Sequence, residues 1–210
     1  MKQKRILVLG PHTDDGEWGA GASICKWIEQ GHQVWYAAFS AAEESVRDGF
    51  SPDVLREEIP VAIRALGMHE SNLKVFQHKV RYFPRDRQDI LEEMIRLRAE
   101  FKPCTVLLPS TFDTHQDHEV INREGFRAFK RSTILGYEIP WNNRHIDLTF
   151  FNGVSEAQLQ AKVDAIAAYK SQVFRAPNYE DLIRSLAIQR GSQAGFPYAE
   201  AFEVIRWVEN

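Results

Sequence analysis

The sequence predicts an α/β fold in which helices cover both faces of a mostly parallel sheet. Short apolar runs alternate with longer segments of helical periodicity, which is the pattern of repeated β-α units. Two of the apolar runs end in polar clusters, as expected of strands whose carboxyl ends form a ligand site. The 210 residues are enough for one substantial core. We therefore expect a single-domain, Rossmann-like three-layer αβα sandwich over residues 1–210.

The first half of the chain supplies three of the expected strands. In order, we expect a strand at 5–10, a helix at 17–30, a strand at 33–40, a helix at 51–66 and a strand at 73–77. Gly31 ends the first helix, and Ser51 and Gly67 are suited to cap the second. Pro60 falls inside the second helix, where we expect it to introduce a kink.

The second half continues the alternation and ends in a strand. We expect helices at 85–101, 119–130, 155–171 and 179–189, and strands at 104–109, 133–138, 149–151 and 201–207. Lys102-Pro103 stops the first of these helices. Because β-α units place successive strands in parallel, the ends of strands 5–10 and 104–109 should meet at one rim of the sheet.

Polar side chains gather directly after those two strands. The clusters are His12, Asp14 and Asp15, then His115, Asp117 and His118. Imidazole and carboxylate suit zinc, and also iron(II), cobalt or manganese. His12, Asp15 and His118 can supply the three protein ligands of a catalytic zinc site. Asp14 and His115 would then serve in proton transfer and charge stabilisation.

Each cluster also has a purely structural interpretation. Asp14-Asp15 can cap the helix that follows, since aspartate is favoured at that position. His115 to His118 can be a polar loop that enters the helix expected from Glu119. It is much less favoured that both clusters arise by accident at the ends of two strands. Nucleotide binding is not supported, because no Gly-x-Gly-x-x-Gly follows the first strand.

Composition and charge argue against nucleic-acid-binding, membrane-spanning and disulfide-rich proteins. The net charge of −3, with interspersed acidic and basic residues, gives no basic footprint for nucleic acid. No apolar run is long enough to cross a bilayer, and the first residues lack a signal-peptide core. Cys25 and Cys104 predict no disulfide framework. We expect a cytoplasmic protein without membrane insertion.

These motifs, in this order, strongly resemble the GlcNAc-phosphatidylinositol de-N-acetylase-like (PIG-L or LmbE-like) zinc deacetylases. The matching segments are His12-Thr13-Asp14-Asp15-Gly16-Glu17, Gly19-Ala20-Gly21-Ala22, Arg56-Glu57-Glu58, His115-Gln116-Asp117-His118, Lys162, Ser171-Gln172 and Tyr198-Ala199-Glu200-Ala201-Phe202. Thr13, Ala22 and Tyr169 depart from the family pattern, and none of them is a proposed ligand.

The resemblance implies a zinc-dependent N-deacetylase that converts an N-acetylated amino sugar to acetate and a free amine. It makes His12, Asp15 and His118 the metal ligands and Asp14 the general base. Protonated His115 would stabilise the oxyanion, and Asp117 would orient His115 and keep it charged. Asp113 is a further candidate for the outer shell of the site, and Glu17 either supports the metal loop or is ordinary first-turn charge.

The substrate is expected to contact Arg56, Tyr198 and Trp141. Trp141 can form a sugar platform or an oligomer contact, and Arg56 can instead pair with a glutamate on its own helix. The loops expected to choose the substrate are 41–50, 81–87 and 139–146. Two alternatives remain open: another metal-dependent hydrolase or iron(II) enzyme on the same residues, and a non-catalytic α/β sugar-binding module. Homo-oligomerisation also remains open.

Overall fold

The computed structural model describes residues 3–209, the side chain at position 175 excepted. It contains one sheet of seven strands in the order β3-β2-β1-β4-β5-β7-β6. Strands β1 to β5 are parallel, and β7 runs antiparallel to both β5 and β6. The strands are β1 Arg5–Gly10, β2 Gln33–Ala38, β3 Leu73–Val75, β4 Thr105–Pro109, β5 Thr133–Tyr137, β6 Leu148–Val154 and β7 Tyr198–Arg206.

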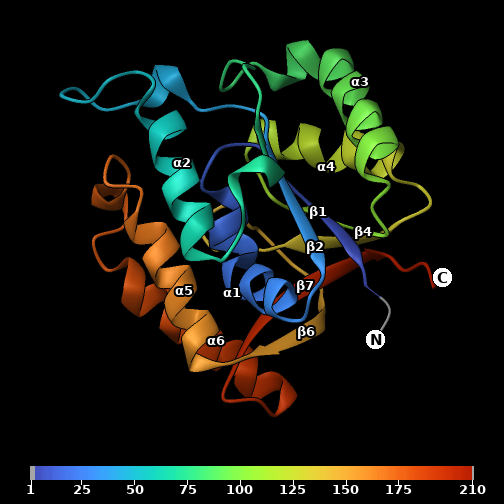
Figure 1. Ribbon diagram of the computed structural model, residues 1–210, viewed down its shortest axis with the longest axis vertical. Coiled ribbons are helices and arrows are strands. Elements are labelled where there is room, and N and C mark those ends of the chain that lie inside the picture. Colours follow the sequence, from blue (N-terminus) through green and yellow to red (C-terminus); the bar gives the residue numbers. More distant parts are fainter. Residues whose placement is uncertain (1–2, 210) are drawn as a thin grey trace.

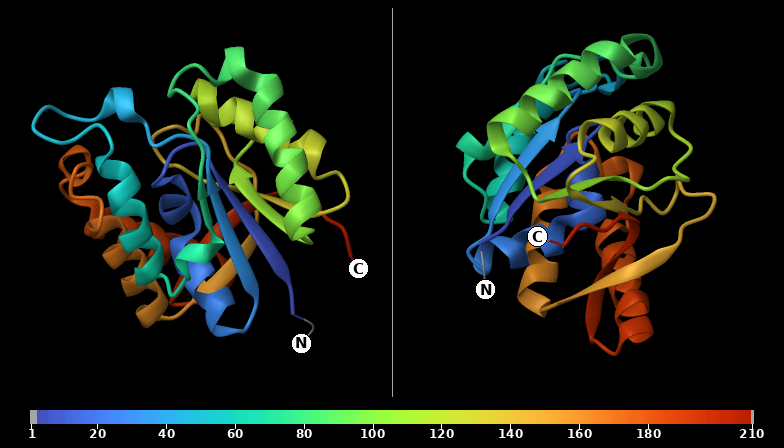
Figure 2. Two further views of the ribbon diagram at one scale, coloured as in Figure 1. Left: turned by 45° about the horizontal axis from the view of Figure 1, so that its top comes forward. Right: turned by 90° about the vertical axis from the view of Figure 1, so that its right-hand side faces the viewer.

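Helices cover both faces of this sheet, which confirms the predicted three layers (Figures 1 and 2). Helices α1, α2 and α5 lie on one face, and α3 and α4 lie on the other. Helix α6 packs on β7 and β6 at the antiparallel end. The helices are α1 Asp15–Glu29, α2 Val54–Ala65, α3 Phe83–Phe101, α4 Gln116–Ala128, α5 Glu156–Ala167 and α6 Tyr179–Ala194.

The two faces of the sheet carry separate cores because side chains alternate along each strand. On β1, Ile6 and Val8 join the core beneath α1 and α2. Leu7 and Leu9 join the opposite core beneath α3 and α4. Helix α1 approaches the sheet closely through Gly19, where a Cβ atom would lie 2.3 Å from Cδ2 of Tyr137. The lack of a side chain at Gly19 therefore allows α1 to pack closely against β5.

Several element boundaries differ from the sequence prediction. Helix α1 begins at Asp15 rather than at residue 17, and α4 begins at Gln116 rather than at residue 119. Asp15, Asp117 and His118 therefore lie in first turns of helices, and His12 lies in the loop before α1. Strand β6 is longer than the expected 149–151, because it pairs along β7.

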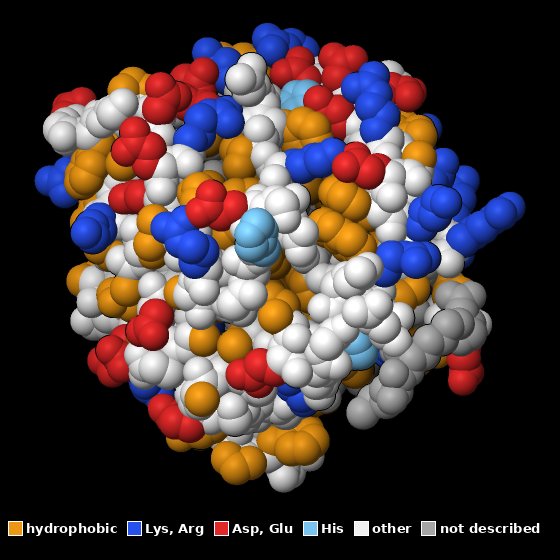
Figure 3. Space-filling view, viewed as in Figure 1, with side chains coloured by type: hydrophobic (Ala, Val, Ile, Leu, Met, Phe, Trp, Pro, Cys, Tyr) orange, Lys and Arg blue, Asp and Glu red, His pale blue; other side chains and the backbone are white. Residues whose placement is uncertain are grey.

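Helix α6 continues past the expected residue 189 to Ala194 and ends at Gly195, which has a φ of 78°. Acidic and basic side chains are interspersed over the face drawn in Figure 3. Cys25 and Cys104 are both free thiols. Within residues 3–209, no helix has the length and apolar character needed to span a membrane.

Candidate metal centre and cavity

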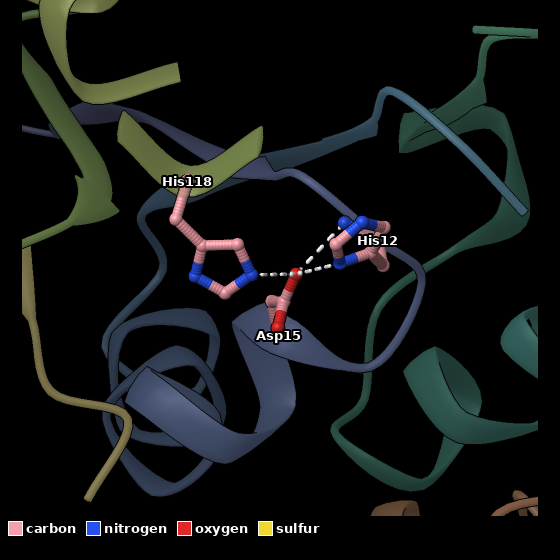
Figure 4. A group of neighbouring side chains, drawn as sticks. All are labelled: His12, Asp15 and His118. Carbon is pink, nitrogen blue, oxygen red and sulfur yellow. Dashed lines mark hydrogen bonds and ion pairs between the residues drawn. The ribbon is translucent and has the colours of Figure 1, made fainter. Parts of the chain in front are cut away.

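The two polar clusters meet at one rim of the sheet, as predicted, because β1 and β4 are neighbouring parallel strands. His12 follows β1, Asp15 opens α1, and His118 lies in the first turn of α4. The Oδ2 atom of Asp15 lies 3.1 Å from Nδ1 of His12 and 3.3 Å from Nε2 of His118. Figure 4 shows the two rings pointing toward this one carboxylate oxygen. The three donor atoms converge within 4.8 Å, which makes the group fit for a metal ion.

The local backbone holds Asp15 in this position. The backbone N–H of His12 donates to Oδ2 of Asp15 at 2.8 Å. Asp14 occupies the N-cap position of α1, but its side chain makes no capping hydrogen bond. Neither carboxylate of this pair therefore caps α1 through a side-chain hydrogen bond.

Each imidazole of this group has a carboxylate at its other nitrogen. Nε2 of His12 lies 3.1 Å from Oδ2 of Asp117, and Nδ1 of His118 lies 2.7 Å from Oδ2 of Asp113. Both carboxylate side chains are fully buried. Such outer carboxylates fix the tautomer and orientation of metal-binding histidines. Asp113, which the sequence offered only as a further candidate, thus occupies the same position relative to His118 as Asp117 does to His12.

The expected relation between Asp117 and His115 needs correction. The Asp117 carboxylate contacts His12 rather than the His115 ring. The link to His115 runs in the other direction, since the backbone N–H of Asp117 donates to Nδ1 of His115 at 3.2 Å. His115 thereby caps α4.

The protonation state expected of His115 is also wrong. Burial, together with the nearby imidazoles of His118 and His12, lowers the pKa of His115 to about 4. The ring is therefore neutral at pH 7. Its Nδ1 atom is an acceptor, so Nε2 carries the proton.

The centre favours positive charge between its carboxylates. Burial lowers the pKa of His12, but the hydrogen bonds to Asp117 and Asp15 outweigh it and raise the pKa to about 9. Burial likewise lowers the pKa of His118, and the charge of Asp15 and the bond to Asp113 raise it to about 10. In the metal-free protein, protons on these two rings balance the carboxylates. A divalent cation would replace that charge.

A buried carboxyl group supports the loop that carries the centre. Glu17 is fully buried and contacts the phenol oxygens of Tyr36 at 3.0 Å and Tyr169 at 2.7 Å. The same two phenols contact the carbonyl oxygen of Thr13 at 2.9 and 2.6 Å. Burial raises the pKa of Glu17 to about 8 although both phenol contacts lower it. Glu17 is thus a support of the 12–15 loop, and not an exposed first-turn charge.

A cavity of about 400 Å³ opens beside the metal-binding group. Its lining combines the polar centre with apolar and aromatic side chains from α1, α2, α5 and the connecting loops. It includes His12, Thr13, Asp14, Asp15, Trp18, Ala42, Ser45, Leu55, Val80, Arg81, His115, His118, Trp141, Asn142, Ile166, Tyr169, Gln172, Val173 and Ala176. Trp141 is 56% exposed and meets Trp18 edge to face at 5.0 Å.

Two of the expected substrate contacts lie elsewhere. Arg56 does not line the cavity; its guanidinium donates to Glu43 at 2.7 and 3.0 Å and to the carbonyl of Phe76. Its acidic partner is thus in a neighbouring loop, not on α2. Tyr198, the first residue of β7, is also absent from the lining and hydrogen-bonds Glu156.

The cavity also contains residues that the sequence did not single out. Trp18 belongs to no recognised motif. An aromatic residue on a helix usually belongs to the hydrophobic core, so its type alone does not indicate a cavity. Arg81 was anticipated only as part of the loop 81–87, since no pattern identifies which loop cation faces a cavity.

Comparison with known proteins identifies relatives of the chain. The family model described as GlcNAc-PI de-N-acetylase (PIG-L) matches residues 7–129, more than half of the chain. An uncharacterized deacetylase of Escherichia coli, YaiS, is 28% identical over 174 residues, which is 81% of this chain and 92% of that protein. The diacetylchitobiose deacetylase of Thermococcus kodakarensis is 22% identical and covers 96% of this chain and 83% of its own length.

Solved structures share the whole fold. The conserved protein TT1542 of Thermus thermophilus has a TM-score of 0.80 at 22% identity over 99% of this chain and 97% of its own. The N,N'-diacetylchitobiose deacetylase of Pyrococcus horikoshii has a TM-score of 0.77 at 19% identity over 97% and 84%. GalB of Pseudomonas putida, a 4-carboxy-2-hydroxymuconate hydratase, has a TM-score of 0.78 at 20% identity over 99% of both chains. These likenesses establish the fold. The chemistry has to be argued from the residues of the site.

Proposed function

Because the chain belongs to the GlcNAc-PI de-N-acetylase (PIG-L, LmbE-like) family, we propose that it is a zinc-dependent N-deacetylase of N-acetylated amino sugars or their conjugates. The observation that carries this proposal is the placement of Asp14. This carboxylate lines the cavity next to the His12, Asp15 and His118 group. A metal-binding group beside a further carboxylate in a cavity suits metal-assisted amide hydrolysis, with the carboxylate as general base.

The donor set fits zinc. Two imidazoles and one carboxylate form a known set of protein ligands in catalytic zinc sites, and both imidazoles have outer carboxylates. When bound by His12, Asp15 and His118, the metal supplies Lewis acidity and brings the pKa of water to about 7. The same donors also suit iron(II) and other divalent metals.

The residues around this group have separate tasks in the proposed reaction. Asp14 accepts a proton from the attacking water and later delivers it to the leaving amine. His115 is neutral, and its Nε2–H donates a hydrogen bond to the amide oxygen as negative charge develops there. Asp117 and Asp113 orient the rings of His12 and His118. His115 therefore acts as a neutral donor instead of the imidazolium that the sequence suggested.

The relatives and the cavity lining support this substrate class. Names of relatives include diacetylchitobiose and an N-acetylglucosaminyl L-malate, both with N-acetylated amino sugars. Trp141 offers an exposed indole at the cavity, which suits the apolar face of a sugar ring. Arg56 and Tyr198 would act only indirectly, Arg56 by tying the 43–45 segment to the loop after β3.

The experiment compares wild type, Asp14→Asn and the control Asp181→Asn, an exposed acid in the first turn of α6. Zinc content is measured together with acetate and amine release from N-acetylglucosamine, diacetylchitobiose and methyl N-acetylglucosaminide. We expect wild type and the control to turn over and Asp14→Asn to keep zinc but lose about 10²–10⁴-fold in rate.

Other outcomes select among the alternatives. Absence of zinc binding contradicts the metal centre. Oxygen-dependent turnover with iron indicates an iron(II) enzyme, and hydration of an unsaturated acid without amine release indicates chemistry like that of the hydratase relative. Sugar binding that survives in Asp14→Asn, with no turnover in wild type, indicates a binding module.

A further inference from the structure

Arg81 has an unusual backbone conformation at the edge of the cavity. It lines the cavity and has a φ of 72°, in the left-handed region that an arginine rarely adopts. A glycine would occupy this position without steric cost. Strained residues of this kind concentrate at functional sites, where surrounding structure holds them in place.

The strain is maintained by a contact to the metal-binding region. The backbone N–H of Arg81 donates to Oδ2 of Asp117 at 2.6 Å, and that of Phe83 donates to Oδ1 at 3.4 Å. The same Asp117 carboxylate contacts Nε2 of His12 at 3.1 Å. Arg81 is therefore linked to a proposed metal ligand through one side chain, and its position relative to the metal-binding group is fixed.

The backbone bond does not account for the side chain. Glycine or asparagine would supply the same N–H with less strain. The Arg81 guanidinium instead extends to the cavity rim, where Nη2 donates to Oγ of Ser45 at 2.9 Å. Both residues line the cavity.

The charge of Arg81 is not neutralised by a neighbouring acid. Within the described part of the chain, no carboxylate forms an ion pair with the Arg81 guanidinium, although nearby cations have acidic partners. Lys79 pairs with Glu44 at 3.4 Å, Arg56 pairs with Glu43 at 2.7 Å, and Arg85 pairs with Asp86 at 2.7 Å. Arg81 is thus a positive charge held at the rim of the cavity without an anion among the described residues.

We propose that Arg81 selects substrates that carry an oxyanion, a carboxylate or a phosphate, on the amine-bearing part of the molecule. This inference rests on the proposed N-deacetylase function. An acetyl group has no ionisable atom, so the anion must belong to the sugar or its conjugate. The planar guanidinium matches both carboxylate and phosphate oxygens. The hydroxyl of Ser45, 2.9 Å from Nη2 of Arg81, lies at the same place in the cavity lining.

The test uses acidic and neutral substrates of otherwise similar structure. N-acetylglucosamine 1-phosphate and 6-phosphate supply phosphate at two positions, N-acetylmuramic acid supplies a carboxylate, and methyl N-acetylglucosaminide is the neutral reference. Zinc-loaded wild type should show a higher kcat/KM for at least one acidic sugar than for the neutral one. That preference should fall as salt is added, because an exposed charge is screened.

Arg81→Asn removes the charge and tolerates the left-handed backbone better than most residues. It should reduce the acidic-to-neutral ratio of kcat/KM about tenfold, mainly through KM, as expected for one lost charged hydrogen bond. Arg81→Lys should retain part of the ratio. Arg85→Gln, an exposed cation four residues along, should leave the ratio unchanged.

The outcomes separate this inference from the proposed function. Turnover of acidic and neutral sugars with equal efficiency, or an unchanged ratio in Arg81→Asn, overturns the inference and leaves the deacetylase standing. Absence of turnover on all four sugars contradicts the proposed function. In that case, calorimetric binding of the same sugars decides the inference, which fails if wild type and Arg81→Asn bind the acidic sugars equally.

Discussion

Asp113 and His118 form a buried pair, with Oδ2 of the carboxylate 2.7 Å from Nδ1 of the imidazole. The opposite nitrogen of the ring, Nε2, faces Asp15. Asp113 also accepts the backbone N–H of His115 at 2.9 Å. One carboxylate therefore sets both the orientation of a proposed metal ligand and the path of the loop that enters α4.

Replacement of Asp113 by asparagine should weaken zinc binding. The amide side chain would still fit at this position, but it would no longer hold the Nδ1 proton of His118 with a charged acceptor. Loss of such an outer partner lowers metal affinity about 10–100-fold. Competition with a zinc chelator measures the change. Asp164→Asn, an exposed acid on α5, is the control, and equal affinities for the two variants would contradict the role of Asp113.

Zinc binding should release protons at neutral pH. The pKa of His12 is raised to about 9 and that of His118 to about 10, so both rings are protonated at pH 7 in the metal-free protein. Coordination requires one free nitrogen on each ring, so about two protons leave per zinc. Zinc affinity should therefore rise with pH up to about pH 10, where His118 has also lost its proton. Calorimetry in buffers of different ionisation enthalpy measures the protons, and release of none would contradict this account.

Glu17 should make the folded protein less stable as pH rises. Four oxygen contacts join the Glu17 carboxyl, the phenols of Tyr36 and Tyr169, and the Thr13 carbonyl. With Glu17 ionised, two phenol protons satisfy at most two of these contacts, whereas a protonated Glu17 supplies a third. Geometry thus agrees with the pKa of about 8.

The sign follows from linkage. The folded protein keeps the Glu17 proton up to about pH 8, whereas the unfolded chain loses it above its ordinary pKa of 4.5. Between these values, stability falls with rising pH by at most about 1.4 kcal/mol per pH unit. Glu17→Gln removes this dependence, so its stability relative to wild type should grow from about pH 5 to about pH 8. Urea unfolding measures it. Glu57→Gln, an exposed control, should show no such trend.

The sequence predicts the sheet and the position of the site because both depend on local patterns. Buried parallel strands appear as short apolar runs, and polar residues after two of them must meet when those strands are neighbours. The first residues of α1 and α4 could not be predicted as well from the sequence. His115 caps α4, and histidine is not among the residues that usually signal a helix start.

The partners of the site residues could not be predicted in the same way. The pattern His115-Gln116-Asp117-His118 places Asp117 beside His115 along the chain, but the start of α4 directs its carboxylate to His12. The pairing of Arg56 with Glu43 and the exposure of Arg81 to the cavity likewise depend on how loops from different strands meet. Sequence spacing identifies which groups are present, and the tertiary structure decides what each one contacts.

Lys162 and Glu200 form a buried ion pair whose loss should destabilise the protein strongly. Nζ of Lys162 lies 2.7 Å from Oε1 of Glu200, and each side chain is 6% exposed. Glu200 also accepts the backbone N–H groups of Ala22 and Ser23 in α1. Within residues 3–209, Lys162 is the only cation that forms an ion pair with Glu200. Lys162→Met leaves this buried carboxylate unpaired, so we expect the free energy of unfolding in urea to fall by about 3–5 kcal/mol.

A second substitution distinguishes this charge effect from a packing defect. Lys162→Met with Glu200→Gln removes both charges and keeps an acceptor for the α1 amides, so it should recover most of the lost stability. The exposed pair of Lys74 and Glu100 supplies the reference, since Lys74→Met should change stability by less than about 1 kcal/mol. If the double variant is no more stable than Lys162→Met, the methionine itself packs poorly between α1 and α5. The pair would then contribute to the seat of α1, which carries Asp15, through shape and not through charge.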